Sequence, residues 1–90
     1  MFEHIKRLLT ISKEKDVDLS IAYAMAYKEG MQKEGFDKSK LDSARNLIDD
    51  YYEEVTKMWN QGNLEAIETL CNLVEDGDME SLGKLLKEWR

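Results

Sequence analysis

Apolar side chains recur along the chain with the 3.6-residue period of an amphipathic helix, and no polar–apolar alternation of period two lasts for the length of a strand. Because the chain has no proline, its five glycines mark the breaks between helices. This pattern predicts an all-α fold. We expect a compact single-domain bundle of about five helices over residues 1–90, ending in C-terminal helical hairpins.

The N-terminal half contains two predicted helices of different character. The first covers about residues 2–13 and has one apolar face, formed by Phe2, Ile5, Leu8 and Leu9. Asp18 is expected to cap the second, about residues 19–34, by accepting hydrogen bonds from free backbone N–H groups. Apolar residues surround nearly the whole second helix, which is typical of a central, buried helix. Gly35 should end it in a left-handed conformation, with Phe36 folding back.

A third, longer helix is predicted from near Ser39 to Gly62. Ser39 and Asp42 are expected to form a capping box at its start. Its apolar stripe is continuous and consists of Leu41, Ala44, Leu47, Ile48, Tyr51, Tyr52, Val55, Met58 and Trp59. A stripe this wide is also a candidate interface for a symmetric homodimer.

The last third of the chain contains a weak internal repeat, in which residues 61–67 align with residues 76–82. In each copy a glycine ends one helix, Asn63 or Asp78 caps the next, and a glutamate follows in the first turn. These short turns predict that the third, fourth and fifth helices pack as successive antiparallel hairpins around the second. Generic capping chemistry produces the same pattern, so the repeat identifies no family.

The net charge of −6 is unevenly distributed. Residues 1–40 contain eight basic and seven acidic side chains, whereas residues 41–90 contain five basic and twelve acidic ones. An acidic half-chain repels phosphate, so we expect no direct binding to nucleic acid or to an anionic membrane. The same charge favours a protein partner with a basic surface. No apolar run reaches the roughly 18 residues of a membrane span.

The sequence offers little catalytic or metal-binding chemistry. His4 is the only histidine and Cys71 the only cysteine, which excludes an internal disulfide, a Cys-based zinc site and His-based catalytic pairs. Cys71 falls on the apolar stripe of the fourth helix, where we expect a small buried hydrophobic residue that stays reduced in the cytoplasm. We therefore predict a protein that is not an enzyme and has no metal and no cofactor.

The acidic cluster at residues 49–54 is the most conspicuous candidate binding site. Asp49 and Glu53 are four residues apart, as are Asp50 and Glu54, and each pair shares a helix face largely opposite the apolar stripe. Such pairs can hold Ca²⁺ or Mg²⁺, but a bundle metal site would also need Glu-x-x-His motifs on other helices, and the chain has none. The cluster is therefore either a solvated helix face or the face that meets a basic protein.

Two apolar residues, Ile11 and Leu73, lie off the stripes of their helices, which indicates either a third packing neighbour or an exposed contact site. We predict a small acidic, non-catalytic protein-binding module, an adaptor or inhibitor whose partner-binding residues are Asp49, Asp50, Glu53, Glu54, Ile11 and Leu73. A stronger form of this hypothesis is mimicry of the DNA phosphate backbone at the surface of a nucleic-acid-binding protein. The alternative is a structural homodimer without a separate ligand.

Overall fold

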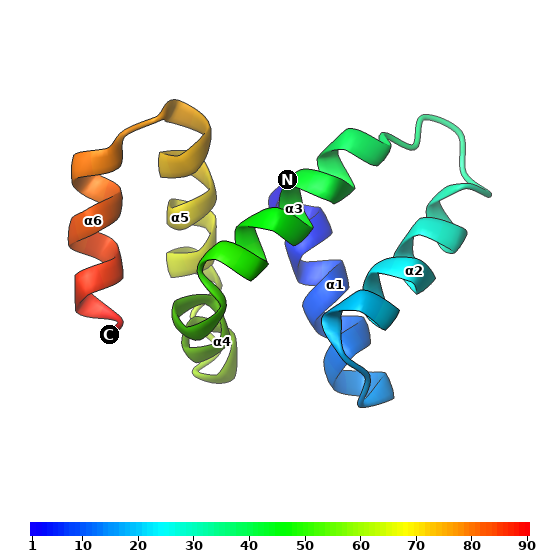
Figure 1. The fold of residues 1–90 in the computed structure, drawn as a ribbon, viewed down its shortest axis with the longest axis horizontal. Coiled ribbons are helices and arrows are strands. Elements are labelled where there is room, and N and C mark those ends of the chain that lie inside the picture. Colours follow the sequence, from blue (N-terminus) through cyan, green and yellow to red (C-terminus); the bar gives the residue numbers. More distant parts are fainter. The chain divides into compact units, whose positions relative to one another are not determined.

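The computed structural model describes residues 1–90 as six α-helices without a strand, and the helices contain 79% of the residues. The all-α fold class is thereby confirmed. The helices are α1 (Phe2–Lys15), α2 (Leu19–Gly30), α3 (Lys38–Asp50), α4 (Tyr52–Asn60), α5 (Leu64–Asp76) and α6 (Met79–Glu88), shown in Figure 1.

The chain divides into two compact units, residues 1–48 and residues 49–90. In the first unit α1 and α2 pack against each other as a helical hairpin (Figure 1). In the second unit α4 packs against α5 and α5 against α6, which confirms the predicted C-terminal hairpins. The prediction of a single domain, with the hairpins arranged around the second helix, stays a prediction.

Local contacts shape the connections before and after α2 in the first unit. Asp18 caps α2 as predicted, because its Oδ1 accepts a hydrogen bond from the Ile21 N–H at 3.0 Å. Gly35 has the predicted positive φ of 74°, but it does not end α2 as predicted, because the helix stops at Gly30 with the right-handed residue Met31 as its C-cap. Phe36 folds back so that its ring meets the edge of the Tyr27 ring, with centroids 5.8 Å apart. The same ring fills the space beside Gly30, where a Cβ atom would come within 2.4 Å of it.

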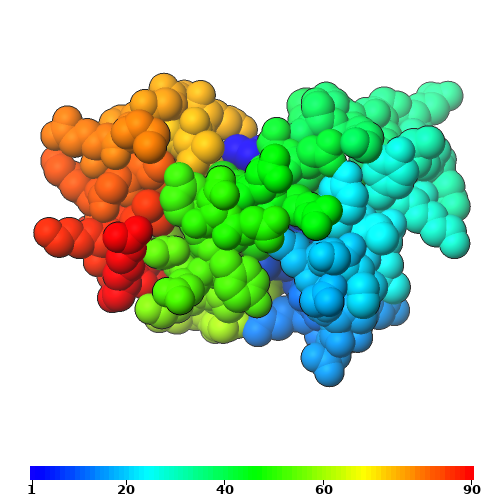
Figure 2. Space-filling view, viewed as in Figure 1, coloured from blue at the N-terminus to red at the C-terminus, as the bar shows by residue number.

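The second helix is shorter and more exposed than predicted. It ends at Gly30 instead of near residue 34, because the Gln32 and Lys33 N–H groups bond carbonyls three residues back, at Glu29 and Gly30, as in a turn. Ala22 and Ala26 are buried, but Ile21 is 48% exposed and Met25 41% exposed. The prediction of a central helix that is buried all round is therefore wrong, and side chains of α2 form open surface in the space-filling view (Figure 2).

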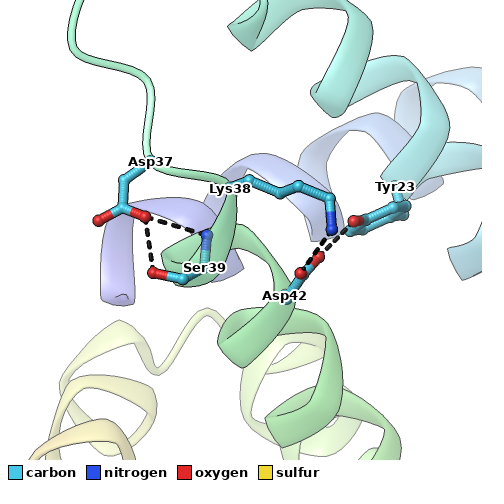
Figure 3. Close-up of polar contacts among 5 residues, drawn as sticks. All are labelled: Tyr23, Asp37, Lys38, Ser39 and Asp42. Carbon is cyan, nitrogen blue, oxygen red and sulfur yellow. Dashed lines mark hydrogen bonds and ion pairs between the residues drawn. The ribbon is translucent and has the colours of Figure 1, made fainter.

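The start of α3 also differs from the prediction of a capping box. Asp37, the residue before the helix, accepts hydrogen bonds at its Oδ1 from the Ser39 N–H at 3.0 Å and from the Ser39 hydroxyl at 2.6 Å. The Asp42 carboxylate does not cap the helix. It accepts hydrogen bonds from the Tyr23 hydroxyl and, at 3.0 Å, from Lys38 Nζ, as Figure 3 shows. Asp42 thereby ties α3 to α2.

The long third helix predicted from the sequence is broken at Tyr51, whose φ of −124° and ψ of 37° are not helical. In one continuous helix Asp49 and Glu53 would be like charges four residues apart, which is destabilising. The break places Glu53 and Glu54 in the first turn of α4, where the helix dipole favours acidic side chains. The break therefore gives Glu53 and Glu54 a favourable charge–dipole interaction, while Asp49 and Asp50 lie in the last turn of α3, where the dipole disfavours acidic side chains.

The two copies of the internal repeat form the same junction between helices. Gly62 and Gly77 both have a φ of 71°. The N–H of the following residue reaches back across the glycine in each copy, at 2.9 Å from Asn63 to the Met58 carbonyl and at 3.1 Å from Asp78 to the Leu73 carbonyl. The side chains of Asn63 and Asp78 then cap α5 and α6 as predicted. The internal repeat therefore corresponds to two copies of one junction, in which a helix ends at a glycine and the next helix begins at a capping residue.

The glycine junction generates a prediction with a matched control. Gly77→Ala should destabilise the protein by about 1 kcal/mol, because alanine is strained at positive φ. Gly83→Ala should stabilise it by about 0.5–1 kcal/mol, since Gly83 lies inside α6 and a Cβ atom there meets nothing within 4 Å. Urea unfolding followed by circular dichroism measures both changes. Equal midpoints for the two variants would contradict the role of the left-handed turn.

A second prediction concerns pH. Hydrogen bonds from Tyr23 and Lys38 hold the pKa of Asp42 below its ordinary value of 3.8. A carboxyl with a lowered folded-state pKa stabilises the fold above its unfolded value and loses that contribution as the pH falls through the folded value. Asp42→Asn should therefore lower the unfolding midpoint at neutral pH, and the difference from the parent should shrink below pH 3.8. Tyr23→Phe should reproduce part of the effect. A pH-independent difference would contradict this assignment.

Candidate functional site

The structure does not keep the predicted acidic cluster on one solvent face. Asp49 and Asp50 are exposed at the end of α3, and Glu53 is exposed in the first turn of α4. Glu54 is only 7% exposed, and its Oε1 accepts a hydrogen bond from Arg90 Nε at 3.1 Å. Its assignment to a solvated or partner-binding face is therefore wrong, and Glu54 serves the packing of the second unit.

The two off-stripe apolar residues have different surroundings. Ile11 is buried with an exposed fraction of 5%, so it is a packing residue and does not offer an exposed contact. Leu73 is half-buried near the end of α5, and its carbonyl accepts the junction hydrogen bond from Asp78. The apolar stripe of the predicted third helix is also largely buried, and only Tyr52 among its large residues is clearly exposed. That stripe is not free to form a homodimer interface.

A second acidic surface, which the sequence interpretation missed, lies along α5. We call it the α5 ridge and define it by Glu65, Glu68, Glu75 and Asp76, whose positions fall on one side of the helix. All four are exposed, whereas the opposite side of α5 buries Ile67, Leu70 and Cys71. The ridge is therefore an acidic face with two charged ends, separated by the uncharged Asn72, on a helix held in place by its apolar side.

The carboxylates of the α5 ridge have no cation beside them. Helix α5 contains no lysine or arginine, and none of the four acids forms an ion pair. The signal was present in the sequence, because the chain between Lys57 and Lys84 has six acidic side chains and no basic one. This longer stretch is sparser than the dense cluster at residues 49–54 and is therefore less conspicuous in the sequence.

The C-terminal end of the α5 ridge is unfavourable for the helix itself. Glu75 and Asp76 lie in its last turn, where the helix dipole disfavours negative charge by about 0.3–1 kcal/mol per group. No basic residue in that turn offsets the cost. Helix stability therefore does not explain these acids, and departures from local preference of this kind are expected at functional sites.

The other residues of the second unit add to the negative charge of the α5 ridge. Residues 49–90 contain eleven acidic and four basic side chains, whereas residues 1–48 contain eight acidic and nine basic ones. Of the four basic residues, Arg90 is paired with Glu54 and Lys84 with Glu80. The second unit thus has a negative field that its own cations do not neutralise.

The cysteine and the possible metal ligands of the chain are not arranged for catalysis or metal binding. Burial raises the pKa of the Cys71 thiol to about 11, so it is protonated and unreactive at neutral pH. No group of three His, Cys, Asp or Glu side chains is placed to hold a metal ion. None of the six helices combines the length and the apolar character of a membrane span.

An open cavity of about 210 Å³ in the first unit is lined by α1, α2 and the start of α3, with Ala26, Phe36 and Leu41 among its apolar residues. The charges at its rim neutralise one another, since Arg7 Nη2 lies 2.5 Å from Glu29 Oε2. His4 also lines the cavity, and burial lowers its pKa below 6.5. The cavity can receive an apolar side chain, but it presents no net charge to select a partner.

Comparisons with protein-family models, curated proteins and solved structures found no match to this chain. We therefore infer its function from the geometry and charge of its own residues. The α5 ridge brings together four exposed acids that form no ion pair within the chain, and helix stability does not explain two of them, Glu75 and Asp76.

The buried position of Glu54 leads to a stability prediction. Arg90→Ala should destabilise the second unit by about 1–2 kcal/mol, because it leaves a nearly buried carboxylate without its hydrogen-bond donor. Lys87→Ala removes the same charge from an exposed position of α6 and should change stability by less than about 0.5 kcal/mol. Urea unfolding of both variants tests this, and equal midpoints would show that the pair contributes nothing.

Proposed function

We propose that this protein is a non-catalytic protein-binding module, an adaptor or inhibitor, whose acidic α5 ridge meets a basic surface of a protein partner. The observation that carries the proposal is the exposed, unpaired set of acids on α5, including two in a turn where the helix dipole disfavours them. A solubilising face gains nothing from that placement, whereas a basic partner turns the unfavourable charges into favourable contacts.

The predicted cluster at the end of α3 contributes to the same field. Asp50 and Glu53 remain exposed, although Glu54 does not, and they belong to the same acidic unit as the ridge. Charges on one compact unit act together at long range and raise the association rate with an oppositely charged partner. Within the binding function, the ridge supplies specific contacts and the remaining acids supply attraction.

The partner surface that fits this chemistry is rich in lysine and arginine. Surfaces that bind nucleic acid have this character, so an inhibitor that occupies such a surface in place of the phosphate backbone is the stronger form of the proposal. The chain itself should not bind nucleic acid, because its acidic unit repels phosphate.

The ridge can be tested with two variants of equal charge. Glu65→Gln, Glu68→Gln and Glu75→Gln combined remove three ridge carboxylates, and Glu14→Gln, Glu34→Gln and Glu88→Gln combined remove three exposed carboxylates elsewhere. A partner is captured from a lysate of the producing cells at low ionic strength and purified. Its association rate is then measured against ionic strength for parent and variants.

We expect the ridge variant to associate about tenfold more slowly at low ionic strength and to show a weaker salt dependence. The control variant should stay close to the parent, because it changes net charge but not the ridge. Asp50→Asn combined with Glu53→Gln should give an intermediate loss. Equal slowing in both triple variants would mean that only net charge matters, and unchanged rates in the ridge variant would overturn the proposal.

A further inference from the structure

The outer face of α2 has a self-complementary order of side chains. Asp18, Ile21, Met25 and Lys28 follow one another at intervals of three, four and three residues, so they form one stripe along the helix. All four are exposed. From Asp18 to Lys28 the stripe is acidic, apolar, apolar and basic. Two copies of the stripe that run in opposite directions therefore place an acid opposite a base at each end.

The middle of this stripe is apolar surface that the chain leaves open. Ile21 and Met25 are two of the six large apolar residues that the fold exposes, and they are one helical turn apart. Ala24, which lies beside them, is also exposed and is small enough to let another helix approach closely. Apolar residues scattered singly on a surface are ordinary, but a pair flanked by opposite charges resembles half of an interface.

The charges that flank the apolar pair are available to a partner. Lys28 forms no ion pair within the chain. Asp18 uses Oδ1 to cap α2 and has no ion-pair partner, so its second carboxylate oxygen can accept another hydrogen bond.

We propose that this face of α2 binds the same face of a second copy of the chain, in an antiparallel helix pair about a two-fold axis level with residue 23. In that register Ile21 lies opposite Met25 of the second copy, and Asp18 lies opposite Lys28 of the second copy. Each contact occurs twice, because a two-fold interface uses one patch on both subunits. The charges select this register, since a parallel pairing in register would place like charges together.

The proposed dimer is weak. A 12-residue helix is about 18 Å long, and one of its faces is smaller than the roughly 800 Å² that each partner buries in a standard interface. Self-association should therefore appear only at high protein concentration. Sedimentation equilibrium up to about millimolar concentration, the range of weak interfaces, measures it.

Single cysteine variants test the register directly. Parent protein does not cross-link through this face, because its only cysteine, Cys71, is buried. Ile21→Cys mixed with Met25→Cys places the two thiols opposite each other, whereas two copies of either variant alone are offset by about 6 Å along the axis. With an added oxidant, we expect the mixture to form disulfide-linked dimer several-fold faster than either variant alone.

A charge in the apolar centre tests the contact. Met25→Lys should raise the dimer dissociation constant about tenfold or more, because the lost burial counts twice and the new charges repel each other. Met79→Lys makes the same substitution at another exposed methionine, 67% accessible on α6, and should leave dimerisation unchanged. Circular dichroism confirms that both variants are folded.

Several results would overturn the proposal. A parent that stays monomeric throughout the concentration range would leave the face of α2 to a different protein or to solvent. Faster cross-linking of each variant with itself than in the mixture would mean a parallel arrangement. Equal dissociation constants for Met25→Lys and the parent would place the interface elsewhere. The test needs no partner protein, so its outcome is independent of the function proposed for the α5 ridge.

Discussion

The left-handed backbone at Gly62 and Gly77 is the constraint on which the second unit depends. Each glycine stops one helix, and the next residue both reaches back to the preceding helix and caps the following one. The chain reverses in a few residues, so the apolar sides of α4, α5 and α6 meet and bury their Met58, Leu70 and Leu82 side chains. Without those turns the same amphipathic helices would have no neighbours against which to pack.

The two units differ in how far their acidic side chains are neutralised by nearby cations. In the first, ion pairs such as Arg7–Glu29 and Lys38–Asp42 neutralise acids with nearby cations. In the second, the acids of α5 have no cation of their own, so the folded unit keeps its negative field. If the face of α2 joins two copies, the dimer carries two α5 ridges.

Much of the fold could be predicted because its signals are local. A cap such as Asp18 or Asn63 acts on an N–H three residues away, and a glycine needs only its own φ to end a helix. The candidate site was harder to predict, since a charge pattern does not say which acids acquire partners. Glu54 looked equivalent to Glu53 in the sequence, but Arg90, far along the chain, reaches only the former.

The sequence by itself determined the fold class, the caps of α2, α5 and α6 and the glycine turns between the last three helices, since these depend on a residue and its near neighbours along the chain. Tertiary structure alone decided which apolar faces are covered. Ile11 is buried although it lies off the apolar stripe predicted for its helix. Ile21 is exposed although its helix is apolar on nearly all sides. Period and composition report how apolar a face is, but burial depends on whether a second face from elsewhere in the chain packs against it.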